Sequence, residues 1–170
     1  MKSILFVCTG NIFRSVATEY ALRAALRGEH RYRVGSAGIE ASPQRMPPLI
    51  DLRLREKGAD PSRHVQRRLT QALLDTTDVL VAMGLDHREF MRRQFGQEAL
   101  LFNEICHGAE ESVLDIHEAV PDFASNPDAA VAYAARAIDH IWESIPRFLL
   151  NIESLLSGRA ALTKANSHAR

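Results

Sequence analysis

The chain has 170 residues, of which 46% are hydrophobic and 25% are charged. This size is typical of one domain, and the apolar content is well above that of chains that stay disordered. The 21 Lys and Arg residues balance the 21 Asp and Glu residues. The balance excludes a global basic field that recruits nucleic acid or an anionic membrane, so an anion site must be local.

The apolar run near Met1 and the cysteines bear on cellular location. The run ends at Cys8, too early for a signal peptide, and no run reaches the roughly 20 apolar residues of a membrane span. Cys8 and Cys106 are the only cysteines and are far apart in the sequence. This count argues against a disulfide scaffold. We therefore expect a cytoplasmic protein with no membrane or nucleic-acid partner.

The first part of the chain predicts two strands with a helix between them. Residues 4–7 are a continuous apolar run of strand length, which is typical of a strand covered on both faces. A helical pattern begins at Ser15 and stops near Gly28. A second strand is predicted at residues 32–34, followed by a turn at residues 35–38.

The rest of the chain continues the alternation of helices and strands. A helix is predicted from Pro47 to Gly58, strands at residues 78–83 and 100–102, and a last helix that begins at Asn126. Pro146 is expected to kink that helix. The alternation predicts an α/β fold with an open parallel sheet, in which ligands bind beyond the carboxyl ends of the strands.

The stretch CTGNIFRS, residues 8–15, stands at such a strand end. Backbone N–H groups at the start of the following helix favour an oxyanion, and Gly10 and Asn11 allow the chain to curl around it. Arg14 supplies a planar fork that suits phosphate. The predicted phosphate-binding loop comprises Thr9, Gly10, Asn11, Ile12, Phe13, Arg14 and Ser15.

Cys8 at the base of this loop is a candidate nucleophile. A positive environment favours the thiolate, and Ser15 is placed to donate a hydrogen bond to the sulfur. These parts suffice for phosphoryl transfer through a cysteinyl-phosphate. The alternative is a buried structural thiol, which the joint pattern of loop residues makes a poor explanation. A nucleotide-binding phosphate loop is a poorer match, because its GxxxxGK[ST] pattern needs a lysine that this stretch lacks.

The chain resembles the low-molecular-weight protein tyrosine phosphatases. FVCTGNIFRS fits their signature, a strand that ends in CxGNxxRS. VGSAG at 34–38, HVQRRLT at 64–70 and DVLVAMG at 78–84 are similar to further segments of the family. The resemblance covers about residues 2–157. We therefore expect a phosphatase domain over residues 1–157 and a flexible tail over residues 158–170.

The resemblance implies a single domain with a four-stranded parallel sheet flanked by helices on both faces. It also implies no metal and no organic cofactor. By position, Asn11, Ser36 and His64 would form a hydrogen-bonded network that holds the loop, with Ser15 completing it against the sulfur. The expected substrate is a phosphorylated protein or a small phosphomonoester.

A general acid must protonate the leaving oxygen of such a substrate. The family uses an aspartate in a late loop, within an Asp-Pro-aromatic sequence before the last long helix, and Asp122 stands in that place. Its neighbour is Phe123 instead of proline. Asp115 is a rival, whereas Asp128 is better explained as a first-turn acid of the last helix.

The expected substrate pocket departs from that of the family. Ser42 stands near the position of a bulky aromatic, and only Phe123 remains of the aromatic pair beyond the acid. A deep slot for a tyrosine ring is therefore not assured, and phosphotyrosine is not the necessary substrate.

Four other functional interpretations are weaker. A non-catalytic binder of phosphorylated ligands needs the loop but no acid, and a thiol-dependent arsenate reductase needs more cysteines than Cys106 supplies. The spacing of Cys106, His107, Asp115 and His117 matches no standard zinc pattern. The basic group Arg63, Arg67 and Arg68 is better explained as a solvated face than as a contact for an acidic substrate.

Overall fold

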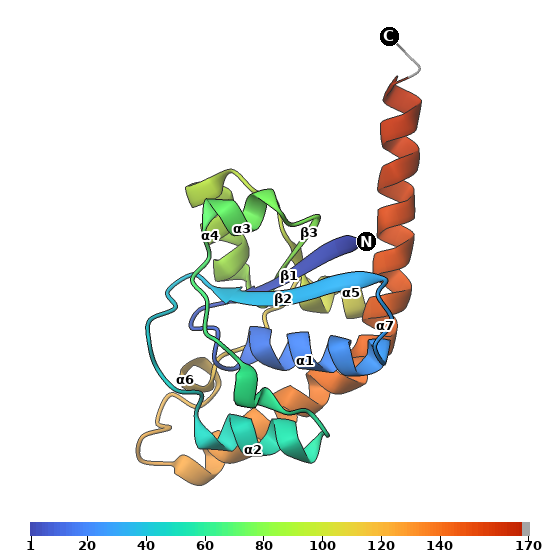
Figure 1. Ribbon diagram of the computed structural model, residues 1–170. Helices are drawn as coiled ribbons and strands as arrows, with labels where there is room; N and C mark the ends of the chain where they lie inside the picture. The colour runs from blue at the N-terminus through green and yellow to red at the C-terminus, as the bar shows by residue number, and fades with distance from the viewer. Residues whose placement is uncertain (168–170) are drawn as a thin grey trace.

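The computed structural model describes the backbone of residues 1–167 and side chains up to residue 157 (Figure 1). Strands and helices alternate along the first two thirds of the chain. The strands are β1 Lys2–Cys8, β2 Tyr32–Gly38, β3 Val79–Ala82 and β4 Leu100–Leu101. The helices are α1 Arg14–Leu26, α2 Pro48–Glu56, the 3-10 turn Pro61–Arg63, α3 Gln71–Asp75, α4 Leu85–Phe95, α5 Phe102–His107, α6 Ile116–Ala119 and α7 Pro127–Ser167.

The four strands form one sheet in the order β2-β1-β3-β4, and all pairs are parallel. β1 is central, so its side chains alternate between two cores. Ile4 and Phe6 pack into the core shared with α1 and α7, whereas Leu5 and Val7 pack into the core shared with α3 and α4. This double burial explains why β1 is continuously apolar. The α/β prediction with helices on both faces is confirmed.

β2 is longer than the sequence pattern predicts. A turn was expected at residues 35–38, but these residues pair with β1 as far as Cys8 opposite Gly38, so this prediction is wrong. The extended pairing with a central strand outweighs the turn preference of glycine and serine. Gly38 is needed at this point, since a Cβ there would lie 2.6 Å from the carbonyl oxygen of Thr9. The glycine therefore lets the loop after β1 pack closely against the end of β2.

α7 covers one face of the sheet and then extends beyond it (Figure 1). Ile138, Ile141 and Ile145 are buried against the same core as α1. Pro146 lies inside the helix, which continues through it, and Figure 1 shows the axis of α7 change direction along its length. Among the described residues, no helix is both long enough and apolar enough to span a membrane.

The segment expected as a tail is helical where the structure describes it. α7 runs to Ser167, past the expected domain boundary at residue 157. Ala, Leu and Lys in this segment are good helix formers, which agrees with its helical backbone. Residues 168–170 lie outside the described residues. The division into a phosphatase domain and a tail remains a prediction.

Candidate active site

The loop between β1 and α1 curls around the buried side chain of Asn11. Asn11 adopts φ 55°, in the left-handed region that asparagine tolerates better than most residues. Its Oδ1 accepts a hydrogen bond from the backbone N of Arg67 at 2.8 Å, and its carbonyl oxygen lies 2.9 Å from Nε2 of His64. These contacts tie the loop to the segment that follows the 3-10 turn.

The amide of Asn11 also sets the direction of the neighbouring hydrogen bonds. Since Oδ1 is taken by Arg67, Nδ2 points to Ser15 Oγ at 3.1 Å and Ser36 Oγ at 2.8 Å and donates to both. Ser15 Oγ lies 2.9 Å from Cys8 Sγ. Because Ser15 accepts from Asn11, its own hydroxyl hydrogen is available for the sulfur. The network therefore presents a donor to Cys8, as a thiolate nucleophile requires.

Glu19 anchors the far end of this network and was missed by the sequence analysis. Ser36 Oγ donates to Glu19 Oε2 at 2.5 Å, and Glu19 Oε1 pairs with Arg23 at 2.6 Å. Glu19 is buried, as are Ser15 and Ser36. Ser15, Glu19 and Arg23 follow one another at i, i+4 spacing on α1. This spacing in the sequence indicates that the three side chains share one face of the helix.

Arg14 is buried at the start of α1, with 1% of its surface exposed. Nη1 donates to the carbonyl oxygen of Val113 at 2.9 Å, and Nη2 donates to Asp115 Oδ2 at 2.7 Å and Thr9 Oγ1 at 3.2 Å. Nε is buried and has no hydrogen-bond partner among the described residues. A buried guanidinium with an open donor in a loop of backbone N–H groups is suited to an oxyanion.

The comparisons with known proteins agree with this geometry. The family model described as low molecular weight phosphotyrosine protein phosphatase matches residues 3–153. The chain belongs to this family. It is a cysteine-dependent phosphatase, and the expectation of phosphatase activity is confirmed.

Two curated relatives support the assignment. The protein-arginine-phosphatase of Bacillus subtilis is 31% identical over 118 residues, which cover 66% of this chain and 77% of the relative. A probable low molecular weight protein-tyrosine-phosphatase, EpsP of Ralstonia solanacearum, is 31% identical over 103 residues, which cover 60% of this chain and 70% of the relative.

Solved structures show the same fold. A mutant of YwlE from Bacillus subtilis matches with a TM-score of 0.76 and 27% identity, over 90% of this chain and 99% of that one. An arginine phosphatase YwlE mutant with a phosphorylated active-site serine matches with a TM-score of 0.75 and 26% identity, over 89% and 95% of the two chains.

The phosphatase has two aspartates that the sequence left as rivals for the acid. Asp115 Oδ2 binds Arg14, while Oδ1 accepts from the backbone N of Ile116 at 2.7 Å and caps α6. Asp122 lies in an exposed turn, and its carboxylate accepts one hydrogen bond from the described residues, from Asn126 Nδ2 at 3.5 Å from Oδ2. Asp128 lies in the first turn of α7. No hydrogen bond or ion pair among the described residues joins Asp122 to the loop.

Three other candidate residues, Cys106, Ser42 and Phe123, make no hydrogen bond with the loop in the part of the chain that the structure describes. Cys106 is buried in α5, where burial raises the pKa of its thiol to about 12. Ser42 is exposed in the segment after β2, and Phe123 is exposed beside Asp122. The described residues contain no group of three or more His, Cys, Asp or Glu side chains placed to hold a metal ion.

His87 is a second residue that the sequence did not single out. It is fully buried at the start of α4, and its Nε2 lies 2.9 Å from Thr9 Oγ1. Gly84 makes room for it, since a Cβ there would lie 3.1 Å from Nδ1 of His87. Burial and then the charge of Arg14 lower the pKa of His87 to about 4, against weaker opposing effects of nearby aspartates. His87 is therefore a neutral support for the loop at physiological pH.

The lowered pKa of His87 predicts a stability loss in mild acid. The unfolded chain takes up a proton near pH 6.5 and the folded chain only near pH 4, so the free energy of unfolding falls as pH drops through this window. At pH 5 the loss amounts to about 2 kcal/mol. We expect His87→Gln to remove most of this loss, measured as the difference in urea unfolding between pH 7.5 and pH 5.

His30→Gln is the matched control for this prediction. His30 is exposed, so the same substitution there should leave the difference between the two pH values nearly unchanged. Equal pH dependence in wild type and His87→Gln would show that His87 is not the group responsible.

Proposed function

We propose that this phosphatase hydrolyses its substrate in two steps at the loop of residues 8–15. Cys8 Sγ attacks phosphorus, the bond to the leaving group breaks, and Asp122 gives its proton to that group. Water then attacks the cysteinyl-phosphate, Asp122 takes a proton from the water, and the sulfur–phosphorus bond breaks to release phosphate. Arg14 and the backbone N–H groups of the loop hold the phosphoryl oxygens throughout.

The observation that carries this proposal is the pairing of Cys8 with a directed donor beside a buried arginine. Ser15 Oγ, which accepts from Asn11, lies 2.9 Å from Cys8 Sγ, and Arg14 keeps a buried Nε without a partner among the described residues. The thiolate is stabilised as nucleophile and again as leaving group by the same hydroxyl. Ser36 and His64 support the loop through Asn11.

Asp122 is proposed as the general acid because Asp115 is already engaged. Both carboxylate oxygens of Asp115 accept hydrogen bonds, one from Arg14 and one from the start of α6, so this carboxylate is held by the protein before any substrate binds. Asp122 has a carboxylate open to solvent in the turn between α6 and α7. Asp115 is better explained as a residue that positions Arg14.

We propose a phosphorylated protein side chain as the substrate. The curated relatives are named as acting on phosphoarginine and phosphotyrosine proteins, at the same level of identity. The exposed Ser42 and Phe123 do not build an aromatic slot of their own, so specificity for a phenyl ring is not assured. A nucleophilic thiol without a disulfide partner also supports the expected cytoplasmic location.

Arsenate reduction is the poorer alternative. Such chemistry needs a second thiol that can pass on the oxidation, and the thiolate is the reactive form. Cys106 is 3% exposed and its pKa is raised to about 12 by burial, so it does not serve as that thiol.

Cys8→Ser should lower the rate of aryl phosphate hydrolysis by about 1,000-fold or more, because the alkoxide is far harder to form than the thiolate. Phosphate should still protect the variant against thermal unfolding, since the loop and Arg14 remain. Cys106→Ser is the control and should keep its activity. Wild-type turnover in Cys8→Ser would rule out the cysteinyl-phosphate route.

Asp122→Asn should slow turnover by about 100-fold or more for alkyl phosphates, which have poor leaving groups. The loss should be much smaller for para-nitrophenyl phosphate, whose leaving group needs little help from an acid. The readout is kcat across a series of leaving groups, with Asp128→Asn as the control. A leaving-group dependence that appears in Asp115→Asn and not in Asp122→Asn would assign the acid to Asp115.

A panel of phosphotyrosine, phosphoarginine and phosphoserine peptides, phosphosugars and small aryl phosphates, compared by kcat/KM, tests the proposed substrate. We expect a phosphorylated side chain to be preferred over phosphosugars and small aryl phosphates, since the open surface around the loop can contact flanking residues. Higher kcat/KM on the phosphosugars would show that the substrate is a small molecule.

A further inference from the structure

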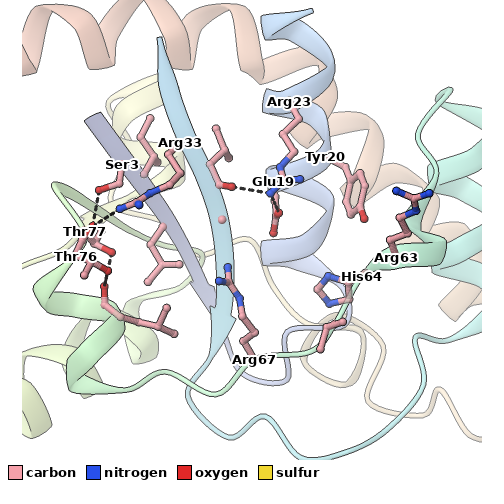
Figure 2. Close-up of a pocket in the computed structure, with 16 residues that line it drawn as sticks. Ser3, Glu19, Tyr20, Arg23, Arg33, Arg63, His64, Arg67, Thr76 and Thr77 are labelled. Atoms are coloured by element: carbon pink, nitrogen blue, oxygen red, sulfur yellow. Dashed lines mark hydrogen bonds and ion pairs between the residues drawn. The ribbon is translucent and has the colours of Figure 1, made fainter. Parts of the chain in front are cut away.

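A second cavity lies at the exposed edge of β2 and is lined by none of the residues of the catalytic loop. Its volume is about 520 Å³, within the usual range of small-molecule sites. Figure 2 shows β2 running through its centre, with α1 side chains on one side and the end of α3 on the other. The polar lining consists of Ser3, Glu19, Tyr20, Arg23, Arg33, Arg63, His64, Arg67, Thr76 and Thr77.

The lining is strongly positive. Four arginines face one carboxylate, Glu19, and both oxygens of Glu19 are already used by Arg23 and Ser36. Arg33, Arg63 and Arg67 have no carboxylate partner among the described residues. Two of these arginines belong to the basic group that the sequence assigned to a solvated face. The structure brings them together with arginines from α1 and β2 around one cavity.

Most hydrogen-bond donors of these arginines are open. Arg67 uses Nε on the carbonyl oxygen of Ser36 at 3.2 Å, and Arg33 uses Nη2 on that of Thr76 at 3.0 Å. Arg63 makes no hydrogen bond or ion pair with any described residue. Each guanidinium carries five N–H donors, so the cavity offers many more donors than the protein satisfies. Guanidinium forks of this kind suit a phosphoryl group.

The form of the cavity favours a small molecule over an extended peptide. An added strand would need the free carbonyl groups along the β2 edge. The guanidinium of Arg23 donates to the carbonyl oxygen of Val34 at 2.8 Å, and that of Arg67 covers Ser36 in the same way. The edge is therefore occupied. The Tyr20 ring, Val34 and Leu73 add apolar wall for an organic group.

We propose that this cavity is a second anion site that binds a small organic phosphate and acts on the catalytic loop. Three residues of the cavity also hold the network around Cys8. Glu19 accepts from Ser36, His64 contacts the carbonyl oxygen of Asn11, and the Arg67 backbone N donates to the Asn11 side chain. A ligand that binds the side chains of Arg67 and Arg23 changes the hydrogen bonds that hold Asn11. It therefore alters the turnover of the substrate as well as the affinity for it.

The test uses phenylphosphonate, which has a ring and a phosphoryl group but a carbon–phosphorus bond that this phosphatase does not hydrolyse. Its binding to the full chain is followed by NMR of backbone and arginine side-chain N–H groups. We expect two sets of shifting signals, one from residues 8–15 and one from Arg63, Arg67, Thr76 and Thr77. Shifts confined to residues 8–15 would overturn the proposal.

Matched double variants separate specific binding from net charge. Arg33→Ala/Arg63→Ala should weaken binding at the cavity by about tenfold or more, because charge-assisted hydrogen bonds are lost, and should keep the shifts of the loop. Arg92→Ala/Arg93→Ala removes the same charge from the exposed face of α4. This variant should keep both the loop shifts and the cavity shifts. Equal weakening in both variants would show that only the overall field matters.

Inhibition kinetics test the link to the loop. In wild type, phenylphosphonate should raise the KM and lower the kcat for para-nitrophenyl phosphate, because it acts at both sites. In Arg33→Ala/Arg63→Ala the inhibition should become purely competitive. Pure competition in both proteins would overturn the link. Failure of the catalytic proposal would be seen separately, in the rates of the Cys8 and Asp122 variants without inhibitor.

Discussion

The buried amide of Asn11 is the constraint on which the catalytic loop depends. Asn11 adopts φ 55°, and every polar atom of its side chain is paired with a partner from α1, from β2 or from the segment after the 3-10 turn. An amide buried without partners is costly, so the loop is stable only when these segments meet around it. The same pairing orients Ser15 toward Cys8. Fold and reactivity therefore share one set of hydrogen bonds.

Charge is the second organising feature. Arg14 is buried, and its charge is compensated by Asp115 and by the carbonyl oxygen of Val113 before any substrate arrives. A buried arginine without such partners would be strongly unfavourable. The partners fix the guanidinium and leave Nε without a partner among the described residues, so the proposed binding of a phosphoryl group would need little reorganisation. Neutral His87 completes the surroundings by supporting Thr9 without adding positive charge that would oppose Arg14.

The edge of β2 connects the catalytic loop to the rest of the surface. Ser36 joins the network on one side of the strand, and the guanidinium of Arg67 covers the Ser36 carbonyl oxygen. Gly38, at the end of the strand, allows the loop to approach within contact distance. An effect on Ser36 or on the backbone of Arg67 reaches Cys8 through three hydrogen bonds, by way of Asn11 and Ser15. This short path is the physical basis for a link between the arginine-lined cavity and the reaction.

Periodicity and local spacing were sufficient to predict where each strand begins to within two residues, the parallel α/β class and the loop after the first strand, because those features depend on neighbours in the sequence. The same pattern predicted four strands, whereas the roles of Ser36 and His64 came from resemblance to a family. The turn predicted at residues 35–38 was wrong, since pairing with β1 outweighs local preference. Only the tertiary structure brought Asp115 to Arg14, His87 to Thr9 and Glu19 to Ser36, because side chains far apart in sequence acquire partners only when the elements pack.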